Sequence, residues 1–148
     1  MKQKIATIFG ATGFIGRHLI RRLTEKDFRI IVATRSPYLH GYLRPLGDPG
    51  QIDFEKVNLF DEKTLRVLLE NSNVVINLVG ILYETRKQKF ENIHSKFPEL
   101  LSRLCNEYGI EKFIHLSALG INENVKSEYI RSKLKGEKNI LNNFDKSI

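Results

Sequence analysis

The sequence predicts an α/β protein built on a doubly wound parallel sheet. Strand-like apolar runs alternate with helical segments along the chain, and this alternation is typical of parallel strands joined by right-handed helical crossovers. A glycine-rich turn at residues 10–16 directly follows the first apolar run, Ile5–Phe9, and opens a helix. We expect five strands, followed by a sixth that is cut off at the C-terminus.

The glycine-rich turn indicates a binding site for a dinucleotide. Such a turn lets the backbone approach a pyrophosphate, and the helix that follows points its free N–H groups at the phosphates. A turn with a purely structural role is the alternative, but the strand before it and the apolar residues at helical spacing after it favour binding. The turn residues expected to contact the dinucleotide are Gly10, Thr12, Gly13, Phe14, Ile15 and Gly16.

The end of the second strand bears on which dinucleotide is bound. Phe28–Ala33 reads as this strand, and Thr34–Ser36 follows it where NAD-binding folds usually carry an acidic residue for the ribose 2′-hydroxyl. A guanidinium can bind a 2′-phosphate as a fork. The alternative is that Arg35 is a surface cation in contact with solvent and binds no phosphate. The sequence therefore favours NADP(H) over NAD(H), with Arg35 and Ser36 near the phosphate.

The next elements continue the alternation. Tyr38–Gln51 is rich in glycine and proline and predicts a loop. A strand is expected at Ile52–Val57, and a short helix is opened by Asp61 as its N-cap. Asn73–Val79 reads as a continuous apolar strand, which is typical of a parallel strand covered by helices on both faces.

The last third of the chain adds two helices and a strand. A longer helix is expected over roughly Phe90–Tyr108, kinked or restarted at Pro98 and ended by Gly109. The strand Lys112–Ser117 and a helix over about Ser127–Asn142 complete the series. Ligands of such sheets bind at the carboxyl ends of the strands, where the strand order reverses. The residues expected at those ends are Gly10, Arg35, Asn58, Gly80 and Ser117.

Tyr129 and Lys133 form a pair with the spacing of a catalytic pair. Residues four apart lie on the same face of a helix, and an ammonium beside a phenol stabilises the phenolate and suits it to acid–base chemistry. The lysine can also hold the nicotinamide ribose, and Ser117 can polarise a carbonyl. The alternative is a tyrosine packed on the sheet with a lysine in solvent. The position of the pair, one strand and one loop after Ser117, favours the functional interpretation.

Composition excludes several classes of protein. The net charge is +7, yet the 24 basic residues are scattered among 17 acidic ones without a long basic run, so nucleic acid is not an expected partner. The densest basic cluster, residues 86–89, is interpreted as a solvated loop or helix start. Four well-separated histidines predict no metal site, and a single cysteine, Cys105, excludes an internal disulfide and is expected in the core.

Length and hydropathy bear on domain organisation and location. The 148 residues suffice for one domain with a substantial core. No apolar run is long enough to span a membrane, so no transmembrane segment is expected. Residues 1–4 lead straight into the first strand and leave no room for a leader, which predicts a chain that is cytosolic in a bacterium or already processed.

Together these features resemble the short-chain dehydrogenase/reductase superfamily over the whole chain. Within it, the chain is most similar to the atypical branch that contains the nucleotide-binding accessory subunit of respiratory complex I and its bacterial relatives. The segments that carry this resemblance are Phe9–Arg17, Leu43–Asp48, Ser72–Gly80, Glu111–Ser117 and Tyr129–Glu137. Leu43–Asp48 and the Asn-Val-Val-Ile-Asn-Leu-Val-Gly run within Ser72–Gly80 are the specific ones, because the glycine turn is shared very widely.

The resemblance implies a Rossmann fold with bound NADP(H). Arg35 then lies near the 2′-phosphate, and the three glycines of the turn meet the pyrophosphate. Asn58 takes the place near the adenine amine where relatives of the extended type carry an aspartate, and Leu59 follows it. Val79 and Gly80 contribute contacts to ribose and adenine through their backbone.

The resemblance leaves two functions open. The atypical branch keeps Tyr-x-x-x-Lys but lacks the complete catalytic set. The first function is therefore a non-catalytic or weakly catalytic accessory protein that binds the nucleotide and docks on complex I subunits or another protein partner. The second is an active NADP-dependent oxidoreductase or epimerase, with Tyr129 as acid/base, Lys133 tuning it and Ser117 assisting. The subfamily resemblance and the short loop Ala118–Lys126 favour the first.

The resemblance also bears on location and chain length. It implies a protein in the bacterial cytoplasm, peripheral on the inner membrane, or on the matrix side of a mitochondrial membrane. Relatives continue for well over a hundred residues past the position of Ile148. Residues 1–148 are accordingly expected to be an N-terminal NAD(P)-binding domain without the substrate-binding part.

Overall fold

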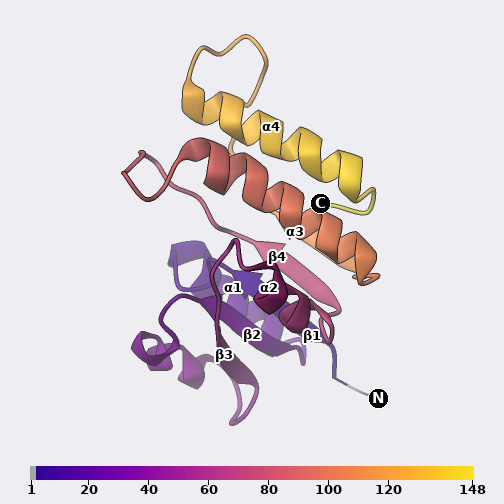
Figure 1. Ribbon diagram of the computed structural model, residues 1–148. Helices are drawn as coiled ribbons and strands as arrows, with labels where there is room; N and C mark the ends of the chain where they lie inside the picture. Colours follow the sequence, from indigo (N-terminus) through magenta and orange to yellow (C-terminus); the bar gives the residue numbers. More distant parts are fainter. Residues whose placement is uncertain (1–2) are drawn as a thin grey trace.

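The computed structural model describes residues 3–148 and shows a parallel sheet with helices on both faces (Figure 1). In the spatial order β3-β2-β1-β4-β5, every pair of neighbouring strands is parallel. The strands are β1 (Ile5–Phe9), β2 (Arg29–Thr34), β3 (Ile52–Lys56), β4 (Val74–Asn77) and β5 (Lys112–His115). The strand order reverses between β1 and β4, so the crevice that receives ligands in such sheets lies there. The predicted doubly wound sheet is confirmed.

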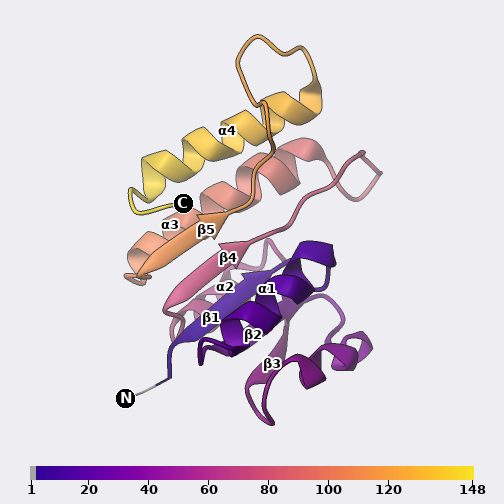
Figure 2. The ribbon, with the colours of Figure 1, turned by 180° about the vertical axis from the view of Figure 1, so that it is seen from behind.

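Helices cover the two faces of the sheet unequally. On one face lies α1, together with a short 3-10 helix, and on the other lie α2 and α3, with α4 packed against α3 (Figures 1 and 2). The α-helices are α1 (Phe14–Thr24), α2 (Glu62–Leu69), α3 (Phe97–Glu107) and α4 (Glu128–Asn143). A π-helix, η3 (Glu91–Lys96), leads directly into α3.

Two apolar clusters fill the space between the sheet and the helices. Successive strand residues point to opposite faces: Ile8 lies in the cluster beneath α1, and Phe9 lies in the cluster beneath α2 and α3. Both side chains are fully buried. This double coverage explains why the strands read as apolar runs in the sequence rather than as alternating patterns.

The long helix predicted over Phe90–Tyr108 is two helices in the structure. It begins as the π-helix η3 and continues as α3 from Phe97, one residue before Pro98. Proline has no N–H to donate to the carbonyl of residue i−4, which here is His94, so the α-helical pattern fails at that carbonyl and the preceding turn widens.

Other element boundaries differ from the expectation for local reasons. The segment 38–51, predicted as a loop, contains 3-10 helices η1 (Pro37–Leu39) and η2 (Gly41–Leu46), and the side chain of Leu43 anchors η2 in the core. Strand β4 ends at Asn77 rather than Val79, because the Asn77 Oδ1 atom accepts the Val79 N–H at 3.1 Å.

Three local expectations are confirmed. The carboxylate of Asp61 caps α2 by accepting the backbone N–H of Thr64 at 3.4 Å. Gly109 follows α3 with a left-handed φ of +61°. The side chain of Cys105 lies in the core, where burial raises the pKa of the thiol.

The end of the described chain lies beside β5. Ser147 forms a parallel bridge with Phe113, and the Ile148 N–H donates to the Phe113 carbonyl at 2.9 Å. The His115 N–H donates in turn to the Ile148 carbonyl at 2.8 Å. This is the place where the sequence predicts a sixth strand to begin.

Candidate dinucleotide-binding site

The three glycines of the turn after β1 have three different structural roles. Gly10 has a left-handed φ of +79°, and a Cβ there would lie 2.8 Å from the Leu78 carbonyl carbon. A Cβ on Gly16 would lie 2.2 Å from the Ala11 carbonyl oxygen, so Gly16 allows α1 to pack against the turn. A Cβ on Gly13 would meet nothing closer than 3.6 Å. Of the three, only Gly13 has room for a side chain, and this free space is where a pyrophosphate can approach the backbone.

Helix α1 begins directly at this turn with its N–H groups available. Gly13 is the N-cap residue, and no side chain caps the helix. The first N–H groups of a helix have no partner inside it and attract anions. Phe14 and Ile15 are 69% and 48% exposed. Thr12 and Gly13 line the first of the two cavities described below, whereas Phe14 and Ile15 line neither. Any contact from these two residues is therefore expected from their backbone.

A cavity of about 610 Å³ lies over the carboxyl ends of β1, β2 and β4. It brings together the glycine turn, the end of β2, the end of β3 and the loop after β4. Its lining consists of Gly10, Thr12, Gly13, Ala33, Thr34, Arg35, Ser36, Leu39, His40, Val57, Leu59, Leu78, Val79, Gly80, Ile81 and Gln88. Eight of the predicted cofactor-binding residues, Leu59 among them, thus share one cavity, although they come from four separate segments of the sequence.

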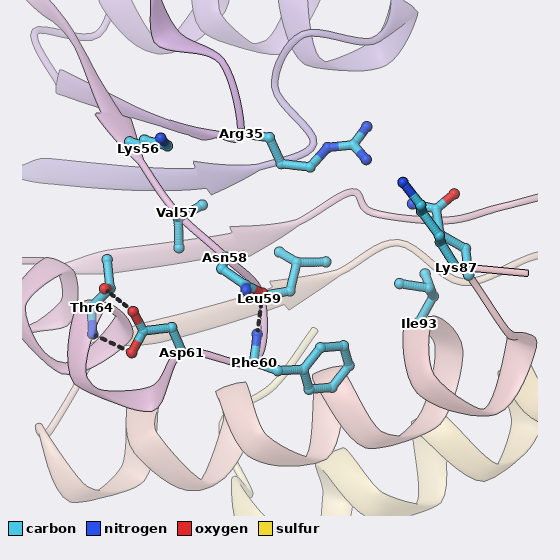
Figure 3. Close-up of a pocket in the computed structure, with 11 residues that line it drawn as sticks. Arg35, Lys56, Val57, Asn58, Leu59, Phe60, Asp61, Thr64, Lys87 and Ile93 are labelled. Atoms are coloured by element: carbon cyan, nitrogen blue, oxygen red, sulfur yellow. Dashed lines mark hydrogen bonds between the residues drawn. The ribbon is translucent and has the colours of Figure 1, made fainter.

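A second cavity, of about 620 Å³, adjoins the first on the side of β3 (Figure 3). The two cavities share Arg35, Val57, Leu59 and Gln88. Asn58 lines the second cavity, and its Oδ1 atom accepts the Phe60 N–H at 3.2 Å, so this oxygen already stabilises the turn after β3. Among residues 3–148 the amide nitrogen of Asn58 has no hydrogen-bond partner, so it is the group that can face a ligand.

The charge of these cavities is predominantly positive. No carboxylate lines the first cavity, and Arg35 makes no ion pair with any acidic residue in the described part of the chain. Lys56 and Lys87 add two cations to the second cavity, and Figure 3 shows the Arg35 side chain extending toward the segment that carries Lys87. The carboxylate of Asp61 is engaged in capping α2. The arrangement favours an anionic group beside Arg35.

A buried ring nitrogen lies at the same end of the first cavity. The Nδ1 atom of His40 is inaccessible to solvent and has no hydrogen-bond partner among residues 3–148. His40 lines the cavity together with Arg35 and Ser36. A buried polar atom without a partner costs free energy, so a ligand hydroxyl or phosphate oxygen that reached it would be stabilising.

Lys133 lies beside Gly80, which lines the first cavity, although neither Lys133 nor Tyr129 belongs to that lining. The lysine is only 4% exposed, and its Nζ atom donates to the Leu116 carbonyl at a long 3.4 Å. A Cβ on Gly80 would lie 3.3 Å from this Nζ atom. Burial lowers the pKa of Lys133, and the nearby carboxylate of Glu137 opposes that effect. A buried ammonium with one long hydrogen bond retains donors for a ligand hydroxyl.

Tyr129 precedes Lys133 by one helical turn and is held by aromatic contacts. Its ring lies 6.0 Å from the Lys133 Nζ atom, measured to the ring centroid. It also contacts the rings of Phe90 and His94 edge to face, at centroid distances of 5.8 Å and 5.2 Å. The structure therefore brings the predicted pair together at the start of α4.

Ser117 lies apart from this pair. Its Oγ atom is buried without a partner among the described residues, and it lines a separate cavity of about 210 Å³ with His115 and the final residues Ser147 and Ile148. The link to Lys133 is indirect, through the carbonyl of the preceding Leu116. The structure does not bring Ser117 into the cavity that contains the glycine turn.

Several residues of the site carried no usable signal in the sequence. His40 and Gln88 lie in segments that read as loops, and Lys87 belongs to the basic cluster interpreted as solvated. His94, which is 1% exposed, stood on the apolar face of a predicted helix. The only available signal was a histidine where the helical pattern calls for an apolar residue.

Comparison with known proteins places the chain in a family. Residues 6–142 match the NAD dependent epimerase/dehydratase family. The mitochondrial NADH dehydrogenase [ubiquinone] 1 alpha subcomplex subunit 9 of Mus musculus is 37% identical over 145 residues, which cover 97% of this chain and 38% of the mouse protein. The protein of the same name in Arabidopsis thaliana is 36% identical over 93% of this chain and 35% of its own length. The chain thus spans less than two fifths of these relatives.

Solved structures share the fold at low sequence identity. The PbgP3 protein of Burkholderia pseudomallei superposes with a TM-score of 0.77 at 18% identity, over 95% of this chain and 49% of that one. The enzyme WbmG of Bordetella bronchiseptica, solved in complex with NAD, has a TM-score of 0.74 at 12% identity, over 96% and 50%. No helix in residues 3–148 is long and apolar enough to cross a membrane. By sequence and by fold, the chain belongs to the NAD dependent epimerase/dehydratase family.

Proposed function

We propose that the chain binds NADP(H) in the two adjoining cavities. The observation that carries this proposal is the charge at the end of β2, where Arg35 stands without an ion-pair partner in a cavity that no carboxylate lines. The 2′-phosphate then meets Arg35 and Ser36, in the part of the cavity that His40 also lines. An acidic residue in this place would repel the phosphate, whereas a guanidinium binds it in a charge-assisted contact.

The remainder of the dinucleotide follows from the order of the strands. The pyrophosphate lies over Gly13 and the N-terminus of α1, and the turn residues Gly10, Thr12 and Gly16 shape that cradle. The adenine lies on the β3 side, against Asn58 and Leu59. The backbone of Val79 and Gly80 lines the path toward the other nucleotide.

At the nicotinamide end, Lys133 and Tyr129 hold the ribose. The buried ammonium beside Gly80 retains donors for the ribose hydroxyls, and Tyr129 lies one helical turn before it. When bound, the nicotinamide supplies or accepts a hydride. The residues of this chain bind and orient it.

A pair of charge reversals tests the cofactor preference. One charge-assisted hydrogen bond contributes about 1.5–3 kcal/mol, so we expect NADPH to bind about 10- to 150-fold more tightly than NADH. Arg35→Asp is expected to reverse this order in calorimetric titrations. Lys26→Asp makes the same change in charge between α1 and the amino end of β2, whereas Arg35 follows the carboxyl end of β2, and it should leave the preference unchanged. Equal affinity for both cofactors in the unmodified chain would refute the assignment.

We further propose that the protein is an accessory nucleotide-binding protein of respiratory complex I, with little or no turnover. Two relatives named as subunits of NADH dehydrogenase support this, as does the separation of Ser117 from the cavity. The location proposed with it is the cytoplasmic side of the inner membrane in a bacterium, or the matrix side in a mitochondrion. Co-purification of the full-length protein with complex I tests the proposal, which fails if the protein is absent from the purified complex.

An active oxidoreductase or epimerase is the second candidate. The observation that favours it is the buried position of Lys133 beside Tyr129, which is costly unless a ligand uses it. The test is cofactor oxidation by the full-length protein across a panel of carbonyl substrates. Turnover that Tyr129→Phe abolishes would establish this candidate in place of the accessory role.

A further inference from the structure

His94 is a buried histidine whose hydrogen bonds determine its tautomer. Its Nε2 atom lies 3.0 Å from the backbone nitrogen of Ile81. A backbone N–H can only donate, so Nε2 accepts and the ring proton lies on Nδ1. Nδ1–H then donates to the Ser132 Oγ atom at 2.9 Å, and this hydroxyl donates to the Tyr129 carbonyl at 2.7 Å.

This chain of hydrogen bonds joins two segments that are distant in the sequence. At one end is the loop after β4, which lines the cavity through Val79, Gly80 and Ile81. At the other end are the first two turns of α4, which carry Tyr129 and Lys133. A Cβ on Gly80 would lie 3.7 Å from His94 Nε2 and 3.3 Å from Lys133 Nζ. The Gly80 backbone, the His94 ring and the Lys133 ammonium are therefore close neighbours.

The surroundings of His94 keep the imidazole neutral and fixed. Burial, followed by the positive charge of Lys133, lowers the pKa of His94 to about 4. A protonated ring would have no lone pair for the Ile81 N–H, so the neutral form is required for the connection. The ring stacks on Phe90 at a centroid distance of 5.4 Å and an interplanar angle of 17°.

The backbone of His94 is fixed as well. Its carbonyl, which Pro98 leaves without an α-helical donor, faces α4 at Gly136, where a Cβ would lie 1.9 Å from the carbonyl oxygen. Glycine at this position lets α4 approach the π-helix closely. Both the ring and the backbone of His94 are therefore in contact with α4.

We infer that His94 is a positioning residue for the nicotinamide end of the dinucleotide site. It holds the Gly80–Ile81 backbone and the Lys133 ammonium close together in a fixed arrangement, and a nicotinamide nucleoside that contacts both must bind beside them. The hydrogen bonds and ring contacts of His94 among residues 3–148 go to Ile81, Ser132, Phe90 and Tyr129, and none goes to Arg35, Ser36 or His40. We therefore expect His94 to leave the adenosine end unaffected. The inference rests on the proposed dinucleotide site and adds a residue that acts on one end of it.

Three substitutions and two ligands test this role. Asparagine places its amide nitrogen near the position of Nδ1 and keeps the bond to Ser132, whereas glutamine places its carbonyl oxygen near Nε2 and keeps the bond from Ile81. Phenylalanine keeps neither bond. Each variant is titrated with NADPH and with adenosine 2′,5′-bisphosphate, which fills only the adenosine end and reports whether that end of the site is folded.

We expect His94→Asn and His94→Phe to weaken NADPH binding at least about 10-fold, since each loses an acceptor worth roughly 1.4 kcal/mol or more. His94→Gln should stay within about threefold of the unmodified chain, and all four proteins should bind the bisphosphate equally. The inference is overturned if the asparagine and phenylalanine variants lose both ligands together, if the glutamine variant loses as much NADPH affinity as the asparagine variant, or if no variant loses any. An unmodified chain that binds neither ligand refutes the proposed function itself.

Discussion

The two ends of the dinucleotide site are built in different ways. At the glycine turn, the residues that shape the cradle lie within seven positions of one another, and backbone N–H groups supply the attraction. At the Tyr129–Lys133 end, the decisive contacts join residues far apart in the chain, such as His94 with Ser132, which are 38 positions apart. The first end is therefore specified by a local motif and the second by tertiary packing.

The two ends also differ in how they use charge. Arg35 is exposed and surrounded by solvent, while Lys133 is 4% exposed and makes one long hydrogen bond. Salt screens an exposed cation far more than a buried one. Tight binding at the adenosine end is thus expected to depend on ionic strength, whereas the nicotinamide end depends on shape and desolvation.

The largest expected effect is the loss of dinucleotide binding in Gly13→Val. A valine side chain occupies the space over the turn that the pyrophosphate needs, so affinity should fall at least about 100-fold, or roughly 2.7 kcal/mol. The fold should survive, because a Cβ there meets nothing closer than 3.6 Å. Gly41→Val, where nothing lies within 4 Å, is the matched control. Normal binding by the Gly13 variant in a calorimetric titration would show that the turn is only structural.

Gly136→Ala should lower the stability of the protein and disturb the Tyr129–Lys133 end of the site, where α4 packs on the π-helix. Alanine ordinarily stabilises a helix interior by about 1 kcal/mol relative to glycine. Here its Cβ would lie 1.9 Å from the His94 carbonyl oxygen, so overpacking should instead destabilise the protein by about 1–3 kcal/mol. Urea denaturation measures the sign directly, with Gly41→Ala as the control. A stabilised Gly136 variant would mean that α4 does not approach the π-helix this closely.

A smaller effect concerns pH. Burial, with the charge of Lys133, lowers the pKa of both His94 and His115 to about 4, below the ordinary value of 6.5. As the pH falls from about 6.5 toward 4, these two histidines therefore bind protons in the unfolded chain but remain neutral in the folded chain. The free energy of unfolding should be constant for these groups above pH 7 and decline below 6.5, by at most about 1.4 kcal/mol per pH unit for one histidine.

The control for this prediction is a comparison of two glutamine variants. His94→Gln should flatten the decline between pH 6.5 and 5, since one of the two buried rings is gone. His18→Gln, on the exposed face of α1, should leave it unchanged. An identical slope in the His94 variant and the unmodified chain would show that this histidine is not buried in a neutral form.

The smallest effect is expected from the ion pairs that join α2 and α3 at the surface. Arg66 of α2 pairs with Glu62 at 2.7 Å and with Glu107 of α3 at 2.8 Å, and Arg103 completes the network. These side chains are 38–43% exposed, so their pairs contribute little. Arg66→Ala should lower the free energy of unfolding by less than about 1 kcal/mol. A decrease of several kcal/mol in the free energy of unfolding, measured by chemical denaturation, would mean that the network stabilises the packing of α2 on α3 more than exposed ion pairs ordinarily do.

The features that could be predicted from the sequence are those that depend on local contacts, and the features that could not be predicted depend on contacts between distant residues. The five parallel strands, the Asp61 cap and the Gly109 terminus are local in origin, and the sequence predicts all of them. The π-helix is not predicted, because it depends on the missing N–H of Pro98 together with the space that Gly136 provides 42 positions after His94. The grouping of Ser117 with Tyr129 and Lys133 rests on its place at the end of the preceding strand, and it stays a prediction. In the structure, Ser117 lines a different cavity from the glycine turn, because the cavities depend on how distant segments pack.

The π-helix has a consequence for the spacing of the chain. A turn of this kind contains one residue more than an α-helical path of the same length, and it behaves as an inserted residue that the sequence has retained. Each residue turns a helix by roughly 100°. Deleting a single residue from Glu91–Lys96 would rotate the residues before the deletion by about that angle relative to α3 and bring a different side chain to the position of His94. The number of residues in this segment is therefore as strict a requirement for the nicotinamide end as their identity.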